Sequence, residues 1–202
     1  MIPIMASEST RRRYVANIVS VWQSASPDQL ARGRAWYRTA HQVADMMTDG
    51  DVRKGAGVIA ALSPQTSWWL NIELAADAVE TGRPTRHFRD ALSKASKILA
   101  GVDPEDVLPM RRKTGQFFLC IADPEHPSAV CVDRHAHDIA IGRPLGQQDR
   151  GLGAHGRYEL VADCYRRAAA RLGERPSTVQ AVTWVVWRER LDRDAARRDQ
   201  EV

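Results

Sequence analysis

The chain has 202 residues, of which 44% are hydrophobic and 27% are charged, and its formal net charge is +4; this length and composition predict a single globular domain over residues 1–202. No stretch approaches 18 consecutive apolar residues, and the basic residues near the start follow the apolar run, which excludes a transmembrane helix and a secretory signal and predicts a cytoplasmic protein. The three cysteines form no CxxC pair, which excludes a zinc ribbon and a four-cysteine iron–sulfur cluster, so we expect no cofactor.

Helical periodicity dominates the sequence and predicts an all-α fold of eight to ten helices. One helix start carries a complete capping signal, with Ser26 as the N-cap, Pro27 at the first helical position and Gln29 three residues after the cap. The short AVCV stretch at 129–132 is the one predicted strand, and residues 192–202 are expected to form a flexible, solvated tail. Helices are predicted over 11–24, 26–47, 52–63, 67–82, 87–101, about ten residues within 103–127, a segment from Asp133, 158–173 and 175–191.

A polar cluster, VDRHAHD at residues 132–138, lies between apolar stretches and allows more than one interpretation. A metal-dependent hydrolase could use His135, His137 and Asp138. On a helix, however, residues i and i+2 project about 200° apart, so such a site would need extended backbone and further ligands. Alternatively, Asp133 caps a helix and the histidines lie on its surface or pair with carboxylates.

Four strings occur in one order along the chain: VIAALSPQT (58–66), LSKASKIL (92–99), VLPMRRKTGQFF (107–118) and VDRHAHDIA (132–140). Together they resemble the helix-hairpin-helix superfamily of DNA glycosylases. In that family an LLSAQ-like run is followed by a KA..I helix, an LPGVGxKTA hairpin and a VDTH helix start. The resemblance covers about residues 55–145 and suggests a divergent member, phage-encoded or actinobacterial. It implies a compact all-α glycosylase-type domain with DNA as its partner.

The resemblance also implies roles for individual residues. Asp133 matches the catalytic aspartate of the VDxH motif, and Lys113 matches the Schiff-base lysine of bifunctional members. Gln65 matches the glutamine that approaches the DNA where a base has been extruded. His135 matches the histidine of VDxH, and together with its neighbour Arg134 it is expected to contact DNA.

The chain departs from the family pattern in its hairpin, where PMRR replaces the glycines. There Arg111 and Arg112 would supply charge-assisted bonds to a DNA phosphate in place of backbone amides. Outside the pattern, the SWWLN stretch offers Trp68 as a side chain that could stack on a base or wedge a duplex. The alternative for this pair is that Trp69 belongs to the core and Trp68 is merely half-buried.

The implied chemistry suits these residue types. A base inside a duplex must be flipped out to be reached, and cleavage of its N-glycosidic bond develops positive charge on the sugar. Asp133 would stabilise that charge and help to activate the attacking water, whereas Lys113 could attack C1′ as a nucleophile and then cut the strand. We therefore expect a DNA glycosylase for a damaged or modified base. The alternatives are a non-catalytic DNA-binding or protein-binding phage protein on this scaffold, and the metal-dependent hydrolase.

Overall fold

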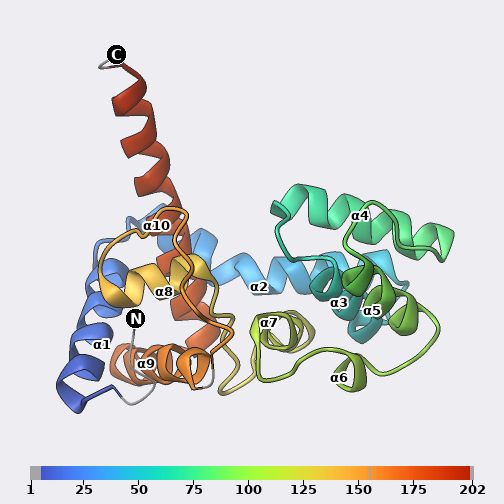
Figure 1. Ribbon diagram of the computed structural model, residues 1–202, viewed down its shortest axis with the longest axis horizontal. Helices are drawn as coiled ribbons and strands as arrows, with labels where there is room; N and C mark the ends of the chain where they lie inside the picture. The colour runs from blue at the N-terminus through green and yellow to red at the C-terminus, as the bar shows by residue number, and fades with distance from the viewer. Residues whose placement is uncertain (1–5, 155, 201–202) are drawn as a thin grey trace. The chain divides into compact units, whose positions relative to one another are not determined.

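The computed structural model describes residues 6–154 and 156–200, without the side chains of 198–200. This part of the chain is all-α, as the sequence predicts, and contains ten helices and no strand. The helices (Figure 1) are α1 Glu8–Gln23, α2 Pro27–Met47, α3 Val52–Ala61, α4 Trp68–Thr81, α5 Arg89–Leu99, α6 Pro104–Val107, α7 Lys113–Ala122, α8 Arg134–Ile141, α9 Arg157–Leu172 and α10 Pro176–Gln200.

The chain divides into two units. Unit 1 comprises residues 1–36 and 130–202, and unit 2 comprises residues 37–129, so the boundary falls within α2. Unit 1 therefore contains α1, the start of α2 and α8 to α10, whereas unit 2 contains α3 to α7 and the end of α2. The single domain expected from the sequence stays a prediction.

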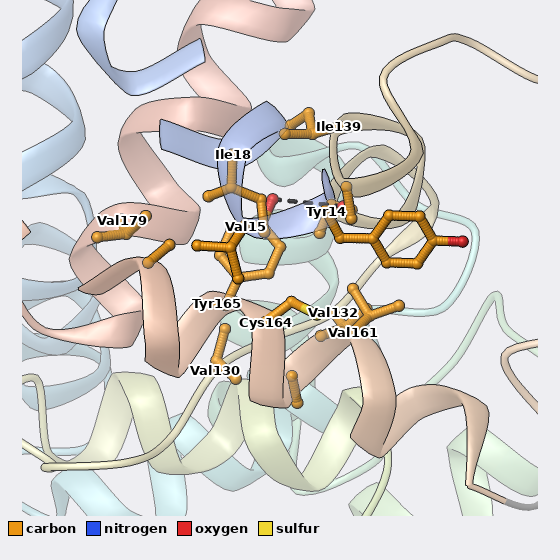
Figure 2. Close-up of a cluster of buried hydrophobic side chains, with 14 of the residues drawn as sticks. Tyr14, Val15, Ile18, Val130, Val132, Ile139, Val161, Cys164, Tyr165 and Val179 are labelled. Carbon is orange, nitrogen blue, oxygen red and sulfur yellow. Dashed lines mark hydrogen bonds between the residues drawn. The ribbon is translucent and has the colours of Figure 1, made fainter. Parts of the chain in front are cut away.

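The core of unit 1 is built from α1, α8, α9 and α10 around an extended segment that precedes α8. Figure 2 shows part of this cluster, with the aromatic ring of Tyr165 among aliphatic side chains from several elements. The Tyr165 hydroxyl is buried yet satisfied, because it donates to the Ala136 carbonyl oxygen at 3.3 Å and lies 3.4 Å from the Thr183 hydroxyl. The core thus fixes α8 against both α9 and α10.

Unit 2 is organised around α3, which packs against α4, α5, α6 and α7. Every residue from Gly55 to Ala61 is buried, which confirms the core helix predicted over 52–63. Two glycines allow the close packing, because an added Cβ would overlap the backbone of Ala44 at Gly55 and the ring of Pro104 at Gly57. Small residues on α3 therefore determine how closely its neighbours approach.

Two local signals for a helix start and a helix end are confirmed by the structure. The Gln29 amide N–H donates to Ser26 Oγ at 3.2 Å, and the Ser26 amide N–H donates to Gln29 Oε1 at 2.9 Å. This reciprocal pair is the capping box that the sequence predicts. Helix α4 ends as predicted at Gly82, whose φ of 68° is left-handed and suits glycine.

The prediction of a strand at 129–132 is wrong. This segment is extended and buried, but no second strand pairs with it in the described part of the chain. The Tyr158 hydroxyl makes the hydrogen bonds that a neighbouring strand would make. It accepts from the Val132 amide N–H at 2.9 Å and donates to the Val130 carbonyl oxygen at 2.8 Å. A side chain thus satisfies backbone groups that a strand would pair in a ladder.

The tail predicted over 192–202 is helical as far as the structure describes it, because α10 continues to Gln200; residues 201–202 lie outside the described residues. Residues 192–197 are exposed, as a solvated tail would be. The three cysteines, Cys120, Cys131 and Cys164, are all buried. No helix of the described residues is long and apolar enough to cross a membrane.

Candidate functional site

Asp133 lies at the N-terminus of α8, where the extended segment held by Tyr158 enters the helix. Its Oδ1 accepts from the Ala136 amide N–H at 2.8 Å, which confirms the predicted N-cap. Its Oδ2 accepts from Trp184 Nε1 at 3.1 Å. The half-buried carboxylate is therefore held by one bond at each oxygen, and each oxygen retains further acceptor capacity.

His135 packs beside the same indole. Its ring lies edge-on to Trp184, with centroids 6.3 Å apart, and its side chain is nearly buried at 8% exposure. Arg134 Nε donates to His135 Nε2 at 3.3 Å, which places the ring proton on Nδ1. Burial lowers the pKa of His135; the negative charge of Asp133 opposes this shift, and the positive charges of Arg134 and Arg188 reinforce it. His135 is thus a neutral group against Trp184.

His137 and Asp138 form a separate, buried network on α8. Arg150 binds the Asp138 carboxylate through two bonds, Nη2 to Oδ2 at 2.6 Å and Nε to Oδ1 at 3.0 Å. The Leu145 amide N–H and His137 Nδ1 also approach it, at 3.1 and 3.3 Å. Burial alone would raise the pKa of Asp138, but these bonds outweigh it and lower the pKa to about 2. The network ties the loop after α8 to the helix.

This network bears on the metal interpretation of the cluster. The Asp138 oxygens already face a guanidinium, and His135 Nε2 accepts from Arg134. Among the described residues, no group of three or more histidine, cysteine or acidic side chains is placed to hold a metal ion. In this geometry His135 bonds to Arg134, Asp138 bonds to Arg150, and His137 Nδ1 faces Asp138.

In unit 2, the basic residues predicted to contact DNA lie at the start of α7. Arg111 is exposed, whereas Arg112 and Lys113 are half-buried. A tight turn precedes the helix, closed by a 2.8 Å bond from the Arg112 amide N–H to the Pro109 carbonyl oxygen. An added Cβ on Gly115 would overlap the backbone of Met110, so this glycine lets the turn rest directly on α7. The turn presents its cationic residues from a closely packed support.

Gln65 lies in the turn between α3 and α4 and is exposed. Its φ of 60° is left-handed, an uncommon conformation for a residue other than glycine. The hydroxyl of the next residue, Thr66, fixes the turn by donating to the carbonyl oxygens of Leu62 and Ser63, each at 3.1 Å. The side chain of Gln65 thus projects from a defined backbone.

The structure corrects the alternative in which Trp69 belongs to the core. Trp68 is half-buried, as that alternative has it, but Trp69 is 80% exposed and does not belong to the core. Leu70, next in the chain, is 41% exposed. The role of Trp68 as a DNA contact stays a prediction, and Trp69 is the aromatic side chain of this pair that solvent reaches.

One surface pocket of unit 1 lies between α1 and α9, and no predicted site residue lines it. Its charged groups neutralise one another, since Asp163 pairs with Arg11 at 2.7 Å and with Arg167 at 3.0 Å. We assign no chemistry to this pocket.

Comparison with known proteins places the chain in a family. The model of the family of unknown function DUF7178 matches residues 1–191. The chain belongs to DUF7178. The match includes every predicted site residue of this DUF7178 protein, in both units. No curated protein and no solved structure matches the chain.

The structure of this DUF7178 member groups the predicted site residues into two sets. Asp133, Arg134 and His135 lie together in unit 1, and the second set is in unit 2. The unit 2 set consists of Gln65, Trp68, Arg111, Arg112 and Lys113. Sequence reasoning missed Trp184, the indole that contacts both Asp133 and His135, because it lies in a helix that is apolar almost all round and carries no local signal of a polar partner.

Proposed function

We propose that this DUF7178 protein is a DNA base-processing enzyme that hydrolyses an N-glycosidic bond with Asp133 as its carboxylate. One observation carries the proposal: Asp133 is held at a helix N-terminus by the Ala136 amide and the Trp184 indole, with acceptor capacity left on both oxygens. A carboxylate fixed in this way needs little reorganisation to face a developing positive charge. The exposed Arg134 beside it would hold a phosphate.

The proposed reaction needs no group beyond this carboxylate and water. As the C1′–N bond of the nucleotide breaks, the base leaves with the electron pair and takes up a proton from solvent, and Asp133 later returns to solvent the proton that it accepts from the attacking water. The sugar acquires positive charge, which Asp133 stabilises, and a water oxygen attacks C1′ while Asp133 accepts its proton.

The remaining predicted residues would serve binding in this proposal. Arg111, Arg112 and Lys113 would contact the DNA backbone from the start of α7, and Gln65 would approach it from its turn. That Lys113 is a second catalytic group, for strand cleavage, stays a prediction. His135 is too buried to offer much surface to DNA, and in this proposal it supports the Trp184 indole instead.

A second candidate is a DNA-binding protein without turnover. This candidate is favoured because both hydrogen bonds of Asp133 can be purely structural. The bond from the Ala136 amide caps α8, and the bond from Trp184 ties the carboxylate to α10. Such a protein would bind DNA with a steep dependence on salt, because phosphate contacts release counterions. Its DNA binding would not depend on the charge of Asp133.

The experiment compares wild type with Asp133→Asn on oligonucleotides that carry uracil, 5-hydroxymethyluracil, oxidised or alkylated bases, and on phage-type modified DNA. Mass spectrometry detects released base. Asp51→Asn is the matched control, because Asp51 is also an N-cap aspartate and accepts from the Lys54 amide N–H at 3.1 Å. We expect wild type and Asp51→Asn to release base at similar rates. Asp133→Asn should release it at least about 10²-fold more slowly.

The other outcomes decide between the candidates. Equal release by wild type and Asp133→Asn would contradict the assignment of the carboxylate. Binding of DNA by all three proteins, with no base released by any of them, would establish the binding protein instead. A Lys113→Ala variant that releases base without cutting the strand, where wild type cuts it, would place that lysine in the second step.

A further inference from the structure

Large apolar side chains are exposed in unit 2 only, as far as the structure describes the chain. They are Met46, Trp69, Leu70, Phe88 and Val102. Trp69 is 80% exposed and Phe88 is 55% exposed. Exposure of large apolar side chains to water is energetically unfavourable, and such surfaces often mark a binding site for a partner.

The side of α4 that begins at Trp69 is also contacted by the loop that leads to Phe88. Residues 69, 73 and 77 follow one another at four-residue intervals along α4 and share a side of it. The loop before α5 lies on this side, because Arg86 Nη2 is 3.1 Å from Glu73 Oε1 and Thr85 Oγ1 is 3.4 Å from Asp77 Oδ2. Phe88 follows Arg86 by two residues at the end of this loop, and its ring lies edge-on to His87 with centroids 5.1 Å apart.

The same loop is basic. Arg83, Arg86 and Arg89 are all exposed within the stretch GRPTRHFRD at 82–90. Of the acidic groups nearby, Glu73 pairs with Arg86 and Asp90 pairs with Lys94 at 2.5 Å. Asp77 contacts the Thr85 hydroxyl, and Glu80 is exposed. Arg83 and Arg89 form no ion pair within the described residues. The face formed by this side of α4 and the loop therefore combines two aromatic rings with two guanidinium groups available to an anion.

We propose that this face binds single-stranded DNA, with Trp69 and Phe88 stacking on unpaired bases and Arg83 and Arg89 holding the phosphates. Exposed rings interleaved with arginines match a chain of flat bases joined by anionic links. A duplex keeps its bases stacked on each other and would leave both rings uncovered. The inference names the form of DNA that the protein prefers, and it rests on the proposed function only in taking DNA as the partner.

The test measures fluorescence anisotropy of a labelled single-stranded 20-mer and of its duplex with the full-length protein. Trp69→Ala and Phe88→Ala are compared with Met46→Ala, a control in the same unit that removes an equally exposed apolar side chain (80%) outside the basic loop. We expect wild type to bind the single strand more tightly than the duplex. Trp69→Ala should weaken single-strand binding about tenfold or more, Phe88→Ala somewhat less, and Met46→Ala not measurably.

A double variant, Arg83→Ala with Arg89→Ala, separates charge from stacking. We expect it to reduce the slope of log K against log salt by about 2, since each phosphate contact contributes about 1. Trp69→Ala should leave that slope unchanged. Because all these side chains are exposed, thermal unfolding followed by circular dichroism should match wild type for every variant.

Three results would overturn the proposal: equal single-strand binding by wild type, Trp69→Ala and Phe88→Ala; equal weakening by Met46→Ala; or binding of anionic lipid vesicles in place of DNA. The base-release assay keeps this proposal distinct from the proposed function. Trp69-dependent binding without base release would leave the inference standing and remove the enzyme. Base release with unaltered binding by Trp69→Ala would do the reverse.

Discussion

The two units differ in where the charged and aromatic side chains described above lie, which are mostly buried in unit 1 and exposed in unit 2. In unit 1, Asp138 and Arg150 are buried against each other, and Trp184 bonds to the half-buried Asp133. In unit 2, Trp69 and Phe88 face solvent beside exposed arginines. Burial of an ion pair has a desolvation cost and fixes the geometry of the two side chains. An exposed aromatic ring contributes favourable free energy only when a partner buries its apolar surface. Unit 1 thus holds these side chains in fixed positions, whereas unit 2 leaves its aromatic rings exposed to solvent.

The sharpest test of this contrast removes the charge of the buried pair. Asp138→Asn leaves Arg150 buried without its carboxylate, and we expect the free energy of unfolding to fall by about 3–5 kcal/mol. Asp90→Asn is the control, because its pair with Lys94 lies at the surface of unit 2 and should cost less than about 1 kcal/mol. Urea unfolding followed by circular dichroism measures both, and similar losses would remove the contrast.

Acid should act on unit 1 through the same carboxylate. Asp138 titrates near 2 in the folded protein rather than near 3.8, so its ionisation contributes roughly 2 kcal/mol to stability at neutral pH. Because the folded pKa is the lower one, that contribution is present above about pH 4 and is lost as the pH falls towards 2. Wild type should lose this increment between pH 4 and 2, and Asp138→Asn should not. Parallel acid profiles for the two proteins would contradict the assignment.

A glycine tests the packing of the basic turn in unit 2. Gly115→Ala forces a Cβ against the Met110 backbone, and we expect a loss of about 1–3 kcal/mol in the free energy of unfolding. Gly153→Ala in unit 1 is the control, because a Cβ there meets nothing within 4 Å. Thermal unfolding of the two variants should differ clearly. An unaffected Gly115→Ala would mean that the turn does not depend on close contact with α7.

The smallest expected effect concerns the indole beside Asp133. Trp184→Phe removes the N–H bond to Oδ2, which should cost about 1 kcal/mol and, under the proposed function, lower the rate of base release about tenfold. Trp187→Phe removes an indole of the same size whose Nε1 has no hydrogen-bond partner in the described structure. Base release by Trp187→Phe should therefore match wild type. Equal rates for both variants would exclude a positioning role for Trp184.

The features that the sequence predicts correctly depend on partners close along the chain. The capping box of Ser26 and Gln29 joins residues three apart, and the bond from the Ala136 amide to Asp133 also spans three residues. Residue types and short spacings determine such contacts before tertiary structure forms. The helices and their caps could therefore be predicted without the fold.

The features that the sequence does not predict depend on partners far along the chain. Trp184 lies 51 residues after Asp133, and Tyr158 reaches Val132 across 26 residues. An extended apolar segment indicates a strand, but a hydroxyl supplied by α9 satisfies its backbone instead. Likewise, an apolar pattern cannot tell which of two adjacent tryptophans faces the core, since packing from other helices decides it.

The burial of all three cysteines has a practical consequence for labelling chemistry. Burial raises the pKa of Cys164 to about 11, so its thiolate is scarce at neutral pH, and Cys120 and Cys131 are shielded from reagents. A cysteine introduced at an exposed position such as Met46 would react with a maleimide far faster than any native thiol. Dyes or spin labels can therefore be attached at chosen positions on the wild-type background without first removing its cysteines.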